Sequence, residues 1–389
     1  DVVKFLFDNG ADIKTATKDG ATPVYCAALN GHFDVVKFLF DNGADIKTET
    51  KDGATPVYFA ALNGHFDVVK FLFDNGADIK TETKDGATPV YFAALNGHFD
   101  VVKFLFDNGA DIKTATKDGA TPVYCAALNG HFDVVKFLFD NGADIKTETK
   151  NGATPVGGAA QKGHLDIVKF LFDNGADIEA TTKNGATPVG VAALNGHLDM
   201  VRFLFDNGAD IKATTKDGAT PVYPAALNGH LDVVKFLFDN GADIKATTKD
   251  GATPVYFAAL NGHFDVVKFL FDNGADIIQA DKKGFTPVYL AAQNGHLDVV
   301  RFLLENGADI KVASRDGRTP LHAASDEGHT EVVHLLLEKG ADPAVANKAR
   351  RIPLLSAAKM GHKDVVEALL DRDPLLIDTT DLRDLTALS

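Results

Sequence analysis

Histidines are the residues of this sequence whose spacing most suggests a chemical role. Nine of the 13 histidines, from His32 to His296, recur at intervals of 33 residues, each directly after a glycine. Imidazole nitrogens bind zinc at about 2.1 Å, but equivalent atoms in successive helical layers lie roughly 10 Å apart. These histidines therefore cannot converge on one ion, and we expect the chain to bind no metal and no cofactor.

The two cysteines, Cys26 and Cys125, occupy the same repeat position three intervals apart. The same layer spacing places them roughly 30 Å apart, whereas a disulfide needs Cα atoms within about 7 Å. Two free thiols favour a reducing compartment. No apolar run approaches the roughly 18 residues that cross a bilayer, and we expect an intracellular, cytoplasmic protein.

The spacing does not bring catalytic residues together. A nucleophile needs a base and an orienting group at one point, and a repeated pattern offers copies in a row instead. The Asp-Gly and Asn-Gly pairs are turn signals, and the sequence has no glycine-rich phosphate loop. We therefore expect no enzyme activity.

Charge narrows the class of partner. The net charge is −15, from 39 basic and 54 acidic residues. A duplex-binding protein needs clustered Lys and Arg to displace counterions from phosphates, so nucleic acid is not an expected partner. Complementary potentials favour another protein with a basic or neutral contact surface.

Local signals in each 33-residue unit predict two short helices and a loop. Residues 52–56 combine an Asp-Gly turn with Thr55 as a helix cap and a proline at the first helical position. This first helix contains two alanines and ends at an Asn-Gly pair. A second helix from Asp67 carries Val, Val, Phe, Leu and Phe, and residues 77–85 return as an extended arm. Because one helix pair cannot bury its apolar faces alone, the units are expected to stack.

Three segments carry a family resemblance. Residues 317–322 read GRTPLH, residues 328–329 read GH and residues 340–342 read GAD. These motifs resemble the signature of the ankyrin repeat family, and the 33-residue period extends the resemblance over essentially the whole chain. The resemblance implies an all-α repeat solenoid, curved and elongated, built of helix–turn–helix–hairpin loop units. It also implies that the Gly-His histidine ties loop backbone together and that partners bind the concave face of first helices and hairpin tips.

The repeat predicts the domain organisation. We expect residues 1–389 to form a single solenoid, with a partial repeat at 1–17, ten regular repeats at 18–347 and irregular C-terminal repeats at 348–389. Unsealed ends with apolar faces predict end-to-end self-association. Most units carry Thr-Pro-Val-Tyr where the family has Thr-Pro-Leu-His, so we expect them to lose the histidine hydrogen bond and to pack a tyrosine instead. Arg350 stands where the turn glycine belongs.

One position differs freely between units, and it directly follows the tyrosine. It holds the following residues in chain order: Cys26, Phe59, Phe92, Cys125, Gly158, Val191, Pro224, Phe257 and Leu290. A core position does not accept glycine, phenylalanine and proline without a loss of stability. This position therefore either faces a partner or is a soft spot in the packing.

The middle of the array departs most from the common unit. Glycines replace bulky residues at Gly157, Gly158 and Gly190, Gln161 and Lys162 replace Leu-Asn, and Pro224 stands where a helical N–H bonds backwards. The pattern predicts a depression or kink around residues 150–230. It is either a binding site, which also includes Val191, or the result of drift after duplication.

Two charged groups are further candidates. The hairpin tips carry Lys-Asp pairs such as Lys51-Asp52 and Lys249-Asp250, which form either a solvated edge or a periodic surface for an extended partner. One late unit is rich in basic residues, which either receive an acidic partner or anionic lipid or keep the array soluble. This basic group consists of Lys348, Arg350, Arg351, Lys359 and Lys363.

These observations predict a protein-interaction scaffold or recognition module. The near-identical copies, with their differences concentrated at a few sites, resemble the amplified repeat arrays of fungal immune-type receptors. The alternative is a mechanical spacer or tether within a larger channel or skeletal protein. An engineered array is a third possibility, which the irregular last repeats argue against.

Overall fold

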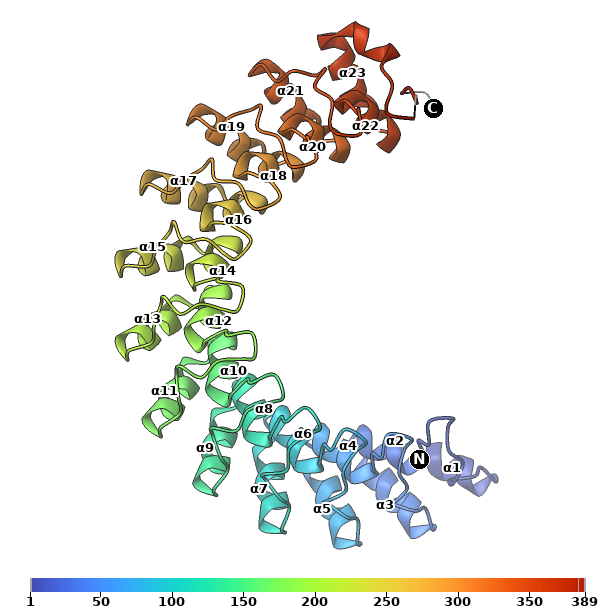
Figure 1. The fold of residues 1–389 in the computed structure, drawn as a ribbon. Coiled ribbons are helices and arrows are strands. Elements are labelled where there is room, and N and C mark those ends of the chain that lie inside the picture. Colours follow the sequence, from blue (N-terminus) through green and yellow to red (C-terminus); the bar gives the residue numbers. More distant parts are fainter. Residues whose placement is uncertain (1, 384, 388–389) are drawn as a thin grey trace. The chain divides into compact units, whose positions relative to one another are not determined.

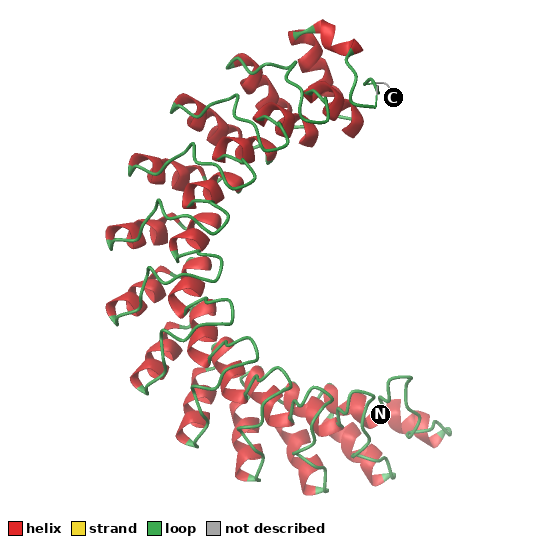
Figure 2. Cartoon of the chain, in the orientation of Figure 1, coloured by secondary structure: helices red, strands yellow, loops and turns green. Residues whose placement is uncertain are grey.

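The computed structural model describes residues 2–383 and 385–387. Over these residues the chain forms 23 α-helices and one 3-10 helix joined by loops, without a β-strand (Figure 2). Contacts divide the chain into two compact units, Asp1–Lys183 and Asn184–Ser389. The repeat boundaries expected from the sequence stay a prediction.

The first unit holds two layers of helices (Figure 1). Each first helix packs on the second helix that follows it, and consecutive first helices within this unit pack on each other. The first helices are α2 (Pro23–Leu29), α4 (Pro56–Leu62), α6 (Pro89–Leu95), α8 (Pro122–Leu128) and α10 (Pro155–Lys162). The second helices are α1 (Val2–Asp8), α3 (Phe33–Asp41), α5 (Phe66–Asp74), α7 (Phe99–Asp107), α9 (Phe132–Asp140) and α11 (Leu165–Asp173).

The second unit repeats the same two-layer arrangement. Its first helices are α12 (Pro188–Leu194), α14 (Val222–Leu227), α16 (Pro254–Leu260), α18 (Pro287–Gln293), α20 (Pro320–Glu327) and α22 (Pro353–Met360). Its second helices are α13 (Leu198–Asp206), α15 (Leu231–Asp239), α17 (Phe264–Asp272), α19 (Leu297–Glu305), α21 (Thr330–Glu338) and α23 (Lys363–Arg372). The 3-10 helix η1 (Pro374–Asp378) follows α23.

The predicted helix start is present in most first helices. In α6, Thr88 accepts a hydrogen bond from the N–H of Tyr91 at 3.3 Å, and proline occupies the first helical position. This bond satisfies one of the backbone donors that every helix start leaves open. Thr55 occupies the capping position of α4 as expected, but its buried hydroxyl makes no cap hydrogen bond.

The second helices contribute valine and leucine side chains to the core of the stack. Val68, Val69 and Leu72 of α5 are at most 1% exposed. Aromatic rings interlock neighbouring repeats, because Phe104 of α7 lies edge-on against both Phe66 and Phe73 of α5, at centroid distances of 5.5 and 5.6 Å. Such edge-to-face pairs stabilise the stack beyond the burial of their area alone.

The recurring Gly-His pair joins one repeat to the next. The Nε2 of His98 donates to the carbonyl oxygen of Leu62, at the end of α4, the first helix of the preceding repeat, at 3.0 Å. Gly64, in the turn after that helix, has φ +72°, and a Cβ there would lie 2.4 Å from Nδ1 of His98. The histidine therefore does tie loop backbone together, and burial lowers the pKa of His98.

Arg350 takes up the left-handed conformation expected of the turn glycine, with φ +55°, and no other non-glycine residue in the described part of the chain has positive φ. We expect Arg350→Gly to raise the free energy of unfolding by about 0.5–1 kcal/mol, because glycine removes the clash of Cβ but adds freedom to the unfolded chain. Urea unfolding followed by circular dichroism measures the change. Ala349→Gly is the control, because Ala349 lies next to Arg350 and does not have a positive φ, and it should be destabilising. If Ala349→Gly also raised the free energy of unfolding, the explanation would be contradicted.

Candidate functional site

The hairpin tips form a connected edge within each unit. Backbone N–H groups bond across neighbouring tips, as from Lys51 to the oxygen of Asp19 at 2.9 Å and from Lys249 to that of Asp217 at 2.8 Å. The side chains of the predicted tip residues Lys51, Asp52, Lys249 and Asp250 are exposed. The Lys51–Asp19 ion pair is long, at 3.8 Å, and its side chains are 67% and 89% exposed, so it adds little stability.

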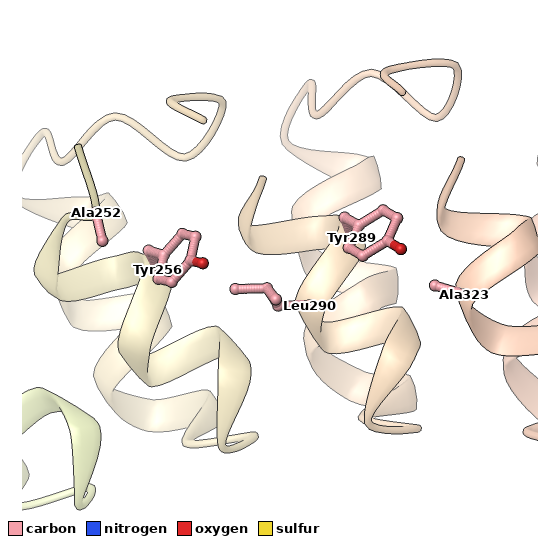
Figure 3. Packing of buried hydrophobic residues seen from close by; sticks show 5 residues of the cluster. All are labelled: Ala252, Tyr256, Tyr289, Leu290 and Ala323. Atoms are coloured by element: carbon pink, nitrogen blue, oxygen red, sulfur yellow. The ribbon is translucent and has the colours of Figure 1, made fainter. Parts of the chain in front are cut away.

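The freely varying position has a defined packing partner. The tyrosine of one repeat contacts the variable residue of the next, as in Tyr25–Phe59 at a centroid distance of 4.4 Å and Tyr58–Phe92 at 4.5 Å. Figure 3 shows the same relation further along the chain, where Tyr256 faces Leu290 and belongs with it to one buried cluster. The size of the variable residue thus affects how tightly two repeats pack.

The predicted residues of α10 do not form a hollow together. Gly158 is buried, and a Cβ built on it would contact Tyr124 at 3.4 Å and Leu128 at 3.5 Å. Side chains of the preceding repeat thus surround Gly158, and its contact with a partner stays a prediction. Gly157 is half-buried, whereas Gln161 and Lys162 lie exposed at the end of the helix.

An apolar pocket of about 240 Å³ opens between α12 and α14 in the second unit. The predicted residues Gly190, Val191 and Pro224 all line it, so the structure brings these three together. The other lining residues are Gly185, Ala186, Thr187, Leu194, Ala213, Thr215, Ala219, Thr220, Pro221, Tyr223, Leu227 and Phe257. They come from three first helices, from the loop that precedes α12 and from the hairpin loop between α12 and α14. Phe257 belongs to the variable position singled out in the sequence, whereas sequence reasoning missed Leu194 and Leu227, which are ordinary residues of the common unit.

Pro224 changes the start of α14. This helix begins at Val222 and has six residues, whereas α12 and α16 begin one position earlier and have seven. Pro221 takes the capping position with φ −53°, and the N–H of Tyr223 bonds to the carbonyl oxygen of Thr220 at 3.0 Å. The hydroxyl of Thr220 is buried without a hydrogen-bond partner. The proline therefore shortens the helix beside the pocket.

Tyrosine keeps a hydrogen bond that we expected it to lose. In the repeat with the family signature, Nε2 of His322 donates to the carbonyl oxygen of Arg351 at 3.0 Å. The Tyr223 hydroxyl donates to the carbonyl oxygen at the equivalent repeat position, Ala252, at 3.2 Å, and also to that of Ala246. Tyr223 is 2% exposed. The expectation was therefore wrong at this position, because a phenol reaches the same acceptor as the imidazole.

Removing the hydroxyl of Tyr223 tests this bond. We expect Tyr223→Phe to lower the free energy of unfolding by about 1 kcal/mol, the usual net contribution of such a hydrogen bond, with more if the buried carbonyl oxygens stay unpaired. Urea unfolding measures the change. Tyr58→Phe is the control, because Tyr58 is also partly buried but its hydroxyl makes no hydrogen bond within the described part of the chain. Equal effects at the two positions would argue against the Tyr223 bond.

In the folded chain, acidic side chains lie beside the basic group of the late repeat. Arg351 pairs with Asp381 at 3.2 Å and Lys363 with Glu367 at 3.0 Å. Lys348 and Lys359 line a cavity of about 580 Å³ that is also lined by acidic side chains. Those acidic residues are Asp316, Asp326 and Glu327. Their charges weaken the attraction of this surface for an anionic partner.

The two thiols differ in exposure, because Cys26 lies at the surface and Cys125 is buried. Both cysteines are free, and burial raises the pKa of the Cys125 thiol to about 11, so it is protonated at neutral pH. Within residues 2–383 and 385–387, no three His, Cys, Asp or Glu side chains lie close enough to share a metal ion. No helix in the same part of the chain has the length and apolar character needed to cross a membrane.

Two layers of short helices, joined by hairpin loops and stacked repeat on repeat, define a helical repeat solenoid. The family model for ankyrin repeats matches residues 1–83, 75–149, 156–248, 208–281, 225–314 and 308–381. These segments cover most of the chain, which therefore belongs to the ankyrin repeat family. No curated protein matches it. Ankyrin repeats generally serve as protein–protein interaction modules and are typically non-enzymatic scaffolds.

Proposed function

We propose that this chain is a protein-interaction scaffold whose partner binds the face formed by the first helices and the hairpin tips. The observation that carries the proposal is where the repeats differ. The second helices repeat nearly the same apolar residues, whereas the first helices hold the variable position and the substitutions at Gly190 and Pro224. A constant scaffold that presents varied side chains on one face is suited to selecting a partner.

Charge and exposure support the same face. At the hairpin tips, backbone N–H groups donate to carbonyl oxygens of the neighbouring tip, so these backbone groups are already paired. The side chains of the tips are exposed. They are thus available to a partner without loss of internal hydrogen bonds. With a net charge of −15, the chain is best matched by a partner with a basic or neutral contact surface, and its association should slow as salt is raised.

The test compares two variants that have the same net charge as the unchanged chain. Each is used to capture binding proteins from a native extract of the source cells. The tip variant carries Lys51→Gln, Asp52→Asn, Lys249→Gln and Asp250→Asn. The control carries the same changes at exposed positions of α7 and α17, namely Lys103, Asp107, Lys268 and Asp272. We expect the control to retain the proteins captured by the unchanged chain and the tip variant to lose them, with both variants showing unchanged circular dichroism.

Two outcomes would contradict the proposal. Loss of capture by the control variant alone would move the contact to the second helices. Equal capture by all three chains, combined with a loss of capture when whole repeats are deleted, would instead indicate a mechanical spacer. A spacer depends on the number of repeats and not on its surface residues.

A further inference from the structure

We propose that the pocket between α12 and α14 accepts a tyrosine side chain of the partner protein. This inference rests on the proposed function and names the contact that one part of the face would make. It starts from the register of the repeats. Gly190 stands at the position where the next repeat carries Tyr223, and Pro224 stands where the repeat after that carries Phe257.

The space in the pocket corresponds to a missing tyrosine. Where the tyrosine is present, its ring fills the gap between two first helices, as Tyr223 does against Phe257 at a centroid distance of 5.8 Å. At Gly190 no side chain enters this gap, and the pocket is there instead. In the second unit, Tyr223 thus fills the gap between its own first helix and the next. One repeat earlier, at Gly190, the equivalent gap stays open.

The polar end of the pocket also matches a phenol. The Tyr223 hydroxyl donates to the carbonyl oxygens of Ala246 and Ala252. Their counterparts 33 residues earlier are Ala213 and Ala219, and both line the pocket. A tyrosine that entered from outside would find two acceptors at the positions where the chain's own tyrosine finds them, whereas a phenylalanine or leucine would leave them unused.

Size and lining agree with an aromatic ring. The pocket measures about 240 Å³ and is walled by Val191, Leu194, Leu227 and Phe257. An apolar protein cavity of about 150 Å³ takes up benzene, and a tyrosine side chain adds only one methylene and one hydroxyl to that ring. Burying the ring removes apolar surface of both molecules from water, which gives the contact its affinity.

The first experiment titrates the full chain with p-cresol, which is the tyrosine side chain cut at Cβ, and follows methyl NMR signals. We expect saturable shifts at Val191, Leu194 and Leu227 with a dissociation constant of about 1 mM, as for a fragment of this size. Toluene, which lacks the hydroxyl, should bind roughly five-fold more weakly. The peptide acetyl-Gly-Gly-Tyr-Gly-Gly-amide should shift the same signals, because the proposed occupant is a side chain on a polypeptide.

Two variants separate pocket filling from folding. Gly190→Tyr supplies the missing ring from within the chain, so it should raise the melting temperature and abolish binding of p-cresol. Gly190→Ala adds only a Cβ, which would lie 3.3 Å from Oγ1 of Thr187, and should retain binding within about two-fold. A destabilised Gly190→Tyr variant, or one that still binds p-cresol at the same methyl groups, would overturn the inference.

The remaining outcomes are equally decisive. Absence of p-cresol binding, or equal binding of toluene, would show that the pocket does not recognise a phenol. Binding of p-cresol without the peptide would assign the pocket to a small phenolic molecule and overturn the partner tyrosine. The tip variant should bind p-cresol as the unchanged chain does. A failure of the proposed function would therefore appear only in the capture experiment, and a failure of this inference would appear only in the p-cresol titration.

Discussion

Gly262→Ala is expected to lower the free energy of unfolding by about 2–3 kcal/mol. Gly262 has φ +72°, and a Cβ there would lie 2.3 Å from Nδ1 of His296. The substitution therefore adds the strain of a left-handed alanine and also displaces the imidazole. His296 would then lose its hydrogen bond to the carbonyl oxygen of Leu260, now 3.0 Å long, and with it one of the ties between two repeats. Urea unfolding measures the loss, and hydrogen exchange locates it.

Gly274→Ala provides a matched control. Gly274 has a similar φ, +85°, but an added Cβ would meet only the mobile end of the Lys245 side chain, at 3.7 Å. Backbone strain alone should lower the free energy of unfolding by about 1 kcal/mol. If the two alanine variants are equally unstable, the histidine contact contributes nothing. If Gly262→Ala is clearly worse, with faster exchange around residues 260–296, the repeats are joined as described.

The second large effect concerns His322 and pH. This side chain is fully buried, with Nε2 donating to the carbonyl oxygen of Arg351 and Nδ1 accepting from the N–H of Thr319 at 3.1 Å. Burial, helped by the charge of Arg318, lowers the pKa of His322 from 6.5 to about 4. The folded chain therefore holds the imidazole neutral over a pH range in which the unfolded chain protonates it.

The sign of the effect follows from this difference in proton binding. The contribution of neutral His322 to stability is complete above about pH 6.5 and is lost as the pH falls towards 4, a loss of about 3 kcal/mol. Burial lowers the pKa of His98 and of His296 in the same direction. Acidification through this window should thus weaken the stack, most strongly around α20.

His322→Tyr isolates the contribution of His322. All seven tyrosines of the chain occupy the equivalent repeat position, so the replacement is one that this fold already accepts. The variant should show a shallower loss of stability between pH 6.5 and 4 than the unchanged chain, measured by hydrogen exchange over residues 319–329 at several pH values. Parallel pH dependence in the two proteins would mean that His322 does not titrate as described.

The sequence by itself determined the local elements and the family. A turn glycine, a capping threonine with proline after it, and an Asn-Gly stop act over a few residues, so they specify two short helices wherever they occur. The 33-residue period and the GRTPLH motif then predicted the ankyrin repeat fold, which the family match confirms. Even the left-handed turn at Arg350 was visible as a break in the glycine pattern.

Only the tertiary structure decided which side chains meet across repeats. Gly158 and Gly190 are both departures from the common unit, yet Tyr124 and Leu128 cover the first while a pocket opens at the second. The hydrogen bond of Tyr223 to Ala252 joins residues 29 positions apart, and no local signal reports it. The physical reason is that contacts between stacked helices depend on the layer spacing and on the side chains of two repeats at once.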